Sequence, residues 1–311
     1  MPSRVATRPG VAPVQWRDQP AVCVQAATGE RAIVALQGAQ LLSWQTADGV
    51  EQLYLSPRAL ADGRSAIRGG VPLCFPQFNQ RVLGARALPK HGFARNLRWQ
   101  HVDVPHMPAA AAAPSARGDA VQATLMLQDD DATRALWPHA FEARVTVTLA
   151  PKELQVQVDL HNRGSSQFAF ALALHTYLRV HDVAQAALHG LAGQHYWDAV
   201  ADAAQPAARR VQRDALLAFH GETDRVYGDG PHALHLHDGA RRVALDASAT
   251  LPDTIVWSPG AALGATLADL PPEGWRHFVC VEAGCIDTPV QLAPGAQWSA
   301  WQRLRSQGEM V

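Results

Sequence analysis

Two titratable side chains stand in strand-like segments where they could exchange protons with a bound ligand. In residues 171–180 (ALALHTYLRV), alternate positions are alanine until His175, which would leave room for a ligand above a sheet face. In residues 278–284 (FVCVEAG), Glu282 ends an apolar strand, where an ionised carboxylate is costly to bury without a partner. Both are candidates for acid–base chemistry. A structural histidine and a structural ion pair are the alternatives.

Basic residues occupy two glycine-containing loops. In residues 65–78 (SAIRGGVPLCFPQF), Arg68 precedes two glycines, which allow the backbone to approach a ligand closely. Such an arginine can bind a phosphate or carboxylate through two N–H groups. In residues 88–96 (LPKHGFARN), His91 and Arg95 could line a polar pocket. A tight turn with a surface ion pair, and a structural histidine at a strand entry, are the alternatives.

Three further features are weaker signals. Asp224 in residues 221–227 (GETDRVY) could accept hydrogen bonds from sugar hydroxyls, or equally pair with Arg225 or cap a turn. Trp257, next to a Ser-Pro-Gly turn, could stack on a sugar or simply pack. His235 and His237 share one strand face; metal binding is conceivable there, but a solvated edge strand is the preferred interpretation.

The elements that must position these residues are mostly β-strands. Residues 154–160 alternate Leu, Val, Val and Leu with Gln, Gln and Asp, and residues 145–149 alternate in the same way. This period of two predicts half-buried strands joined by a hairpin. Further strands are predicted at 21–26, 31–44, 121–128, 168–180, 233–237, 242–246, 254–257 and 278–282. No long amphipathic helix and no βαβ rhythm interrupts the series, although residues 209–219 could form a short helix. An all-β sandwich or barrel follows.

Composition excludes several classes of protein. The chain has 311 residues, with 27 Lys plus Arg against 28 Asp plus Glu, so a bulk electrostatic grip on nucleic acid or an anionic membrane is not expected. Apolar residues reach 48%, which is enough for a sizeable core. There is no apolar run of transmembrane length and no signal-peptide stretch at the N-terminus. The four scattered cysteines predict reduced thiols and a cytoplasmic protein, without a disulfide framework or a structural zinc site.

The chain is expected to form one domain over residues 1–311, with residues 1–19 as a loosely ordered N-terminal arm. Residues 107–114 contain five alanines between two prolines, which indicates a long loop between strands. No internal repeat and no linker divides the chain.

Five motifs in this order give the chain a family resemblance. The chain resembles the hexose-6-phosphate mutarotases (glucose-6-phosphate 1-epimerases) of the aldose 1-epimerase superfamily. The motifs that carry this resemblance are IRGGVPLCFPQF, LPKHGFARN, ALHTYL, ETDRVY and VCVEAG. The resemblance extends from about residue 20 to about residue 305. The resemblance implies an all-β protein with few short helices, built as a large antiparallel β-sandwich of the galactose-mutarotase type. It also implies interconversion of α and β anomers at C1 without a cofactor or a metal.

The resemblance also implies roles for individual residues. His175 matches the general acid and Glu282 the general base, while Arg68 and Arg95 match the arginines that bind the substrate and its phosphate. The remaining matches are His91 and Asp224, at positions that line the sugar site. Lys90 departs from the glutamine of several relatives and could add a cation for the phosphate. We expect a monomer that acts on a small sugar phosphate, with glucose 6-phosphate as the preferred candidate.

Reference pKa values predict an ionised Glu282 and a His175 that can hold a proton near neutrality. Other functions stay open. The same fold could bind a sugar or sugar phosphate without turnover, or act on unphosphorylated aldoses. A metal-dependent enzyme would use His91, His175 and Glu282 as ligands, and a glycosidase would pair Asp224 with Glu282.

Overall fold

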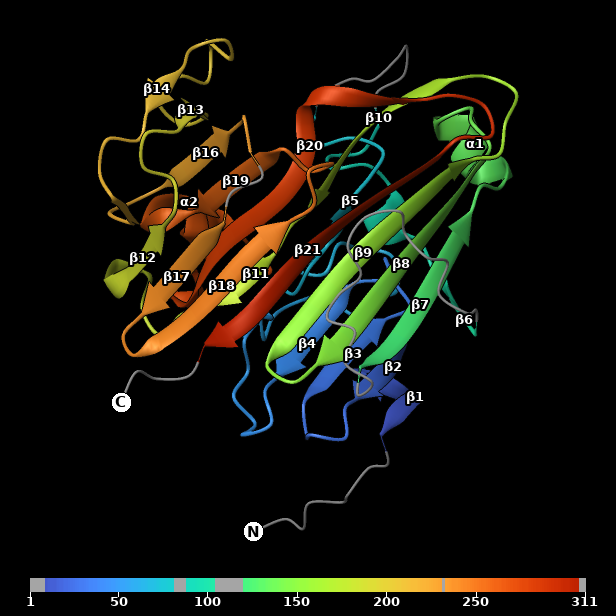
Figure 1. Cartoon of the computed structure of the whole chain (residues 1–311), viewed down its shortest axis with the longest axis horizontal. Helices are drawn as coiled ribbons and strands as arrows, with labels where there is room; N and C mark the ends of the chain where they lie inside the picture. The colour runs from blue at the N-terminus through green and yellow to red at the C-terminus, as the bar shows by residue number, and fades with distance from the viewer. Residues whose placement is uncertain (1–8, 81–87, 104–119, 231–232, 308–311) are drawn as a thin grey trace.

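The computed structural model describes residues 9–80, 88–103, 120–230 and 233–307, and it contains three antiparallel sheets (Figure 1). The first sheet follows chain order: β1 (Gly10–Trp16), β2 (Gln19–Gln25), β3 (Arg31–Ala35) and β4 (Leu41–Gln45). The second has the order β14 (Arg210–Val211), β13 (His195–Asp198), β16 (Thr223–Tyr227), β19 (Asp253–Ser258), β20 (Phe278–Leu292), β10 (Phe168–Leu174) and β5 (Leu73–Cys74), with β11 (Tyr177–Arg179) also paired to β20.

The third sheet has nine strands, in the order β15 (Leu216–Ala218), β12 (Ala186–His189), β17 (Leu234–Asp238), β18 (Arg241–Ala247), β21 (Gln297–Gln307), β9 (Glu153–Asn162), β8 (Phe141–Ala150), β7 (Val121–Gln128) and β6 (Gln100–Val102). Helices in the described residues are short: α1 (Asp131–Leu136), α2 (Gly260–Thr266), and the 3-10 turns η1 (Ala94–Asn96), η2 (Val183–Gln185) and η3 (Gly274–His277). None of them is long and apolar enough to span a membrane. The predicted all-β class is confirmed.

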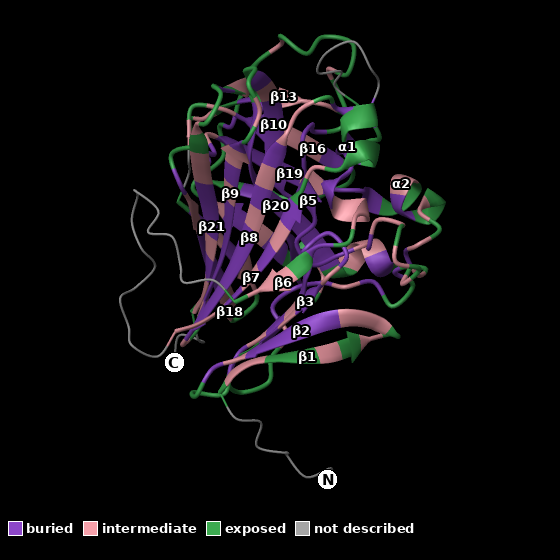
Figure 2. Cartoon of the chain, turned by 90° about the vertical axis from the view of Figure 1, so that its right-hand side faces the viewer, coloured by how far each residue is buried: buried purple, intermediate pink, exposed green. Residues whose placement is uncertain are grey.

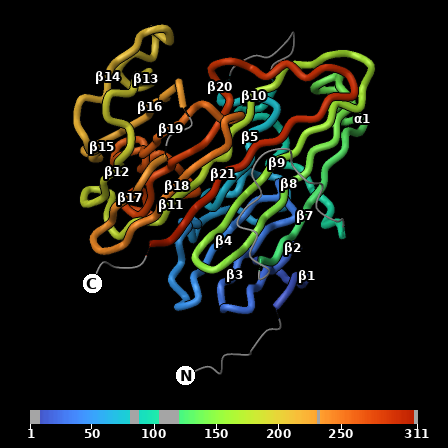
Figure 3. Tube along the Cα trace, in the orientation of Figure 1, coloured from blue at the N-terminus to red at the C-terminus, as the bar shows by residue number. Residues whose placement is uncertain are grey.

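One apolar core lies between the sheets. The predicted alternation in β9 is confirmed, because Leu154, Val156, Val158 and Leu160 all belong to this core. The same core takes side chains from the first sheet and from the second. Figure 2 shows the buried strands above β1, whose residues are exposed or half-buried. Strands distant in the chain meet there: β21 pairs along β9, as the tube in Figure 3 shows. This shared core supports the prediction of a single domain, which stays a prediction.

Several local predictions are wrong. The single strand predicted over residues 31–44 is the antiparallel pair β3 and β4. Residues 10–16 are not a loose arm; they form β1, which pairs with β2 along its whole length. The turn of this hairpin is formed by Arg17 and Asp18, whose φ angles are both positive (46° and 64°). Asn or Gly usually marks such a turn, so its absence here hid the hairpin from sequence reasoning. Residues 209–219 contain β14 and β15 instead of a helix, because sheet partners β13 and β12 pair with them. The alanine-rich residues 107–114 lie outside the described residues.

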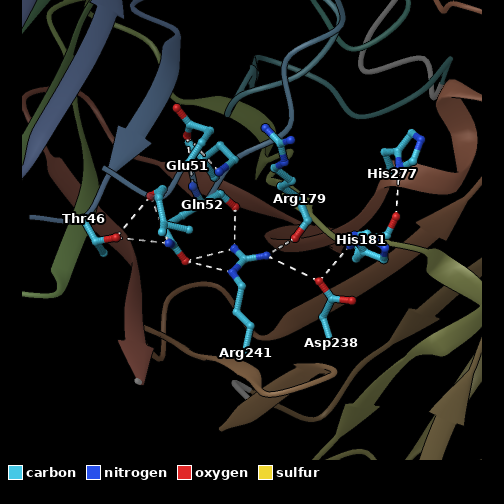
Figure 4. A network of polar contacts seen from close by, with 10 residues as sticks. Thr46, Glu51, Gln52, Arg179, His181, Asp238, Arg241 and His277 are labelled. Atoms are coloured by element: carbon cyan, nitrogen blue, oxygen red, sulfur yellow. Dashed lines mark hydrogen bonds and ion pairs between the residues drawn. The ribbon is translucent and has the colours of Figure 1, made fainter. Parts of the chain in front are cut away.

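An arginine on β18 joins the end of β11 to Gln52, in the segment that follows β4. Arg241 donates from Nε and Nη2 to the Gln52 side-chain oxygen (3.1 and 2.9 Å) and from Nη2 to the Gln52 carbonyl (3.0 Å). It also donates to the Arg179 carbonyl and pairs with Asp238, which accepts from the His181 amide (2.8 Å). Figure 4 shows these contacts converging on one guanidinium. They hold the strand that continues beyond His175.

Candidate active site

His175 and Glu282 lie side by side on the second sheet. The strand predicted over residues 168–180 is interrupted at residues 175–176, between β10 and β11, where the His175 amide donates to the Pro72 carbonyl (3.0 Å). Glu282 lies on β20, which pairs with both β10 and β11. His175 Nε2 lies 3.3 Å from Glu282 Oε1, and the two side chains are 10% and 1% exposed. The sheet therefore brings the two predicted acid–base groups into direct contact.

The alanines that precede His175 pack in a minor apolar cluster that also contains larger side chains. Ala171 and Ala173 pack with Cys74 and Ile255 in a minor cluster, while Leu172 and its alternating neighbours face the main core. The division of faces predicted from the alternating alanines is confirmed. The four cysteines of the chain are free and buried, and burial raises the pKa of the Cys74 thiol. Cys74 therefore acts as a small apolar residue here.

Burial acts on the acid–base pair in opposite directions. It raises the pKa of the Glu282 carboxyl well above its ordinary range, and the Asp224 carboxylate raises it further, against the charges of Arg95 and Lys90. Burial also lowers the pKa of the His175 imidazole well below its ordinary range, helped by Arg95. These directions run against the predicted charge states of the two side chains, which stay a prediction. A neutral pair, with the proton on the carboxyl, avoids two desolvated charges.

His91 is a neutral hydrogen-bond donor whose ring is oriented by the backbone amide of Asn79. Its Nδ1 accepts from the Asn79 amide (3.2 Å) and lies 3.4 Å from Cys74 Sγ. Because Nδ1 is an acceptor, the neutral ring carries its proton on Nε2. Burial, His175 and nearby cations lower the pKa of His91, so the ring stays uncharged. Its centroid lies 5.6 Å from that of His175, which places the predicted residue in the site.

The loop that carries His91 is shaped by glycine. His91 and Gly92 both have positive φ (63° and 74°). A Cβ on Gly92 would lie 2.0 Å from the Phe75 carbonyl oxygen, so the tight backbone packing requires glycine. This packing holds the turn between Lys90 and Arg95 against the sheet.

Among the described residues, no carboxylate forms an ion pair with Lys90 or Arg95. Arg95 Nη2 donates to the Lys90 carbonyl (2.8 Å), while its buried Nε has no hydrogen-bond partner. Neither cation has a carboxylate oxygen within 4.0 Å in the described part of the chain. Both act on the pKa of His91 and of Glu282, so they lie close enough to the pair for their charges to matter. These two cations could therefore attract an anionic group of a substrate.

Arg68, unlike Lys90 and Arg95, is paired with a carboxylate. Its Nε lies 3.1 Å from both carboxylate oxygens of Asp269, and its Nη1 donates to the Tyr177 hydroxyl (3.1 Å). Tyr177 stacks on His175 with ring centroids 4.9 Å apart and planes 11° apart. Arg68 therefore reaches the site as predicted, but with its charge already paired.

Strand register places Asp224 and Trp257 on the site face. Asp224 pairs with Trp257, and Trp257 pairs with Cys280, two residues before Glu282 on β20. Burial raises the pKa of Asp224 to about 6, and Glu222 and Asp198 raise it as well, against Lys90. The half-buried Trp257 ring lies 5.9 Å from His175. A carboxylate and an indole therefore border the acid–base pair.

Sequence reasoning missed two contributors. Tyr177 could have been found, because it shares the alternation of His175. Asp269 could not, since it lies 201 residues from Arg68 in a loop with no motif. In the metal interpretation, no group of three or more His, Cys, Asp and Glu side chains among the described residues could hold a metal ion. The preferred edge-strand interpretation of His235 and His237 is wrong, because β17 lies between β12 and β18.

Comparison with known protein families and sequences gives a consistent result. A family model described as aldose 1-epimerase matches residues 20–305. A protein of Salmonella typhimurium named "Putative glucose-6-phosphate 1-epimerase" is 35% identical over 262 residues, which cover 84% of this chain and 82% of that protein. A protein of Escherichia coli with the same name is 36% identical over 258 residues, covering 81% and 79%.

Solved structures agree with the fold. The crystal structure of a "putative mutarotase" from Salmonella typhimurium superposes with a TM-score of 0.82 at 31% identity, covering 97% of this chain and 95% of that one. A galactose mutarotase-like protein from Clostridium acetobutylicum has a TM-score of 0.74 at 13% identity, covering 96% and 98%. At the latter identity the likeness concerns the fold alone.

Proposed function

The chain belongs to the aldose 1-epimerase family, and on this basis we propose that it interconverts the α and β anomers of a hexose 6-phosphate, glucose 6-phosphate first. The chain is an isomerase of that family. The observation that carries the proposal is the contact between His175 and Glu282, two buried groups that can exchange protons with a sugar. The names of its relatives support the choice of substrate.

The proposed reaction needs only proton transfers. Glu282 takes the proton of the C1 hydroxyl while His175 protonates the ring oxygen; the C1–O5 bond breaks and a C1 carbonyl forms. Rotation about C1–C2 and the reverse transfers then close the ring on the other face. Ring opening leaves a protonated carboxyl and a neutral imidazole, the charge state that burial favours. The starting state needs the shared proton on His175, across the 3.3 Å contact.

Neighbouring side chains supply substrate binding in this proposal. Arg95 and Lys90 bind the phosphate, because their charges have no carboxylate partner among the described residues. Arg68, already paired with Asp269, binds a sugar hydroxyl with its remaining N–H groups. His91 donates from Nε2, and Asp224 accepts from hydroxyls. These two define which sugar faces fit.

We propose that the protein acts as a monomer in the cytoplasm. Its four free thiols support a reducing compartment. Light scattering of the purified protein tests the monomer, and a fluorescent fusion tests the location.

Anomer exchange by NMR tests the proposed reaction. Glucose 6-phosphate, glucose and galactose are each measured with and without the protein. Fast exchange of the phosphate sugar alone is expected. Equal acceleration of free sugars would remove the phosphate preference, and no acceleration by a folded protein would refute the isomerase assignment.

Charge variants then test the phosphate site. Arg95→Gln and Lys90→Gln should each lower kcat/KM for glucose 6-phosphate by about tenfold to a hundredfold, the range for a hydrogen bond to a charged group. Residual activity on free sugar should change little. Arg134→Gln removes the same charge from exposed α1 and serves as the control. Equal losses on both substrates would argue that Arg95 and Lys90 are only structural.

A further inference from the structure

One amide side chain crosses the apolar core to reach the back of the active site. Gln302 lies on β21 of the third sheet and is 5% exposed. Its Oε1 accepts from the Thr176 hydroxyl (2.5 Å), and its Nε2 donates to the Val281 carbonyl (3.1 Å). Because Val281 offers a carbonyl, the amide can adopt only this orientation.

The two partners of Gln302 adjoin the two proposed catalytic residues. Thr176 directly follows His175, and Val281 directly precedes Glu282. Two hydrogen bonds join Gln302 to the Thr176 side chain and to the Val281 backbone, and a third joins these two segments directly, because the Val281 amide donates to the Thr176 carbonyl (3.0 Å). The amide therefore contacts both segments next to the acid–base pair.

A polar residue at this position is unexpected from packing. Its neighbours on the same face of β21 are Ala300 and Leu304, which belong to the core, and a leucine would continue that pattern. A buried amide without hydrogen bonds is destabilising, so the side chain is tolerated because both of its ends are hydrogen-bonded.

Asn162 provides a comparison within the same fold. It is fully buried, and its Nδ2 donates to the Leu292 carbonyl at the far end of β20 and to the Ser166 carbonyl, both at 2.9 Å. Asn162 therefore fastens the same strand by the same chemistry, but away from His175 and Glu282.

We propose that Gln302 is a positioning residue that sets the separation of His175 and Glu282. The inference rests on the proposed function for its catalytic consequence. The 3.3 Å contact depends on two backbone segments that belong to an interrupted strand and its neighbour. A displacement of about 1 Å in such a site can lower a rate about a hundredfold.

Isosteric variants test this role. Gln302→Met removes both hydrogen bonds at similar volume, Thr176→Val removes the hydroxyl, and Thr176→Ser keeps it. Gln302→Met and Thr176→Val should each lower kcat for glucose 6-phosphate by about tenfold or more, with KM within about twofold. The double variant should lose little more than Gln302→Met alone, and Thr176→Ser should retain most of the activity.

A second readout does not depend on turnover. NMR titration of the His175 ring nitrogens, without substrate, reports its contact with Glu282. Gln302→Met should shift the apparent pKa of His175, because the distance to the carboxyl changes. Asn162→Leu is the matched control: it should lower the melting temperature to a similar extent and leave kcat and the His175 titration unchanged.

The outcomes separate the two proposals. Normal kcat and an unchanged His175 titration in folded Gln302→Met overturn the positioning role, whatever the wild type does. Equal kcat losses in Gln302→Met and Asn162→Leu also overturn it, because a general loss of stability would explain both. A wild type without anomerase activity refutes the proposed function, while a shifted His175 titration in Gln302→Met would still support the positioning role.

Discussion

Replacing Glu282 by glutamine should abolish most activity and stabilise the protein. The substitution keeps the shape of the side chain and removes its ability to take a proton. General bases contribute ~10²–10⁴-fold to rates. The side chain is 1% exposed, so bulk water cannot readily replace it as the base. We therefore expect turnover to fall at least about a hundredfold, or about 2.7 kcal/mol in activation free energy.

The stability change has a predictable sign. Burial raises the pKa of Glu282 in the folded protein, so ionisation of this carboxyl opposes folding. The stability that the protonated carboxyl contributes is fully present below the unfolded pKa and is lost as the pH rises through the folded pKa. Glu282 Oε2 has no hydrogen-bond partner among the described residues to offset this loss. Glu282→Gln should therefore gain stability over the wild type as pH rises from about 4.5.

A second buried carboxylate provides the control. Glu30 is 2% exposed but accepts hydrogen bonds from the Lys152 amide (3.0 Å) and the Thr28 hydroxyl. Glu30→Gln should lose stability and keep full turnover. Thermal unfolding between pH 5 and pH 8 and anomer-exchange NMR measure both properties. Near-normal turnover of Glu282→Gln would remove the base role, and a lower melting temperature at pH 8 would refute the argument from desolvation.

Three further substitutions follow from the same geometry. His175→Asn removes the proposed acid and should lower turnover at least about a hundredfold in the exchange assay; a near-normal rate would exclude that role. Burial raises the pKa of Asp224 to about 6, so kcat/KM should fall as pH decreases through about 6 and the carboxylate acceptor is lost. Asp224→Asn should abolish that inflection, and an unchanged profile would assign it to another group. Gly92→Ala should lower the unfolding free energy by at least ~1–3 kcal/mol, because φ is +74° and the new Cβ would meet the Phe75 carbonyl; unchanged stability would contradict this packing.

Local periodicity was enough to predict the sheet faces. A strand places alternate side chains on opposite faces, so the alanines before His175 and the apolar run before Glu282 could be assigned without knowing their partners. The family motifs then implied which residues share a site. The hairpin at Arg17 escaped the same reasoning, because neither turn residue is the usual glycine or asparagine.

The sequence by itself therefore determined the all-β class, the strand faces and the identity of the acid–base candidates. Only the tertiary structure shows in which direction their pKa values shift, because a pKa depends on the water that distant strands exclude and on charges that they bring near. It also decided that Asp269 neutralises Arg68 and that Gln302, 126 residues beyond Thr176, lies behind the pair. These contacts depend on strand order and register, which no local pattern in the chain specifies.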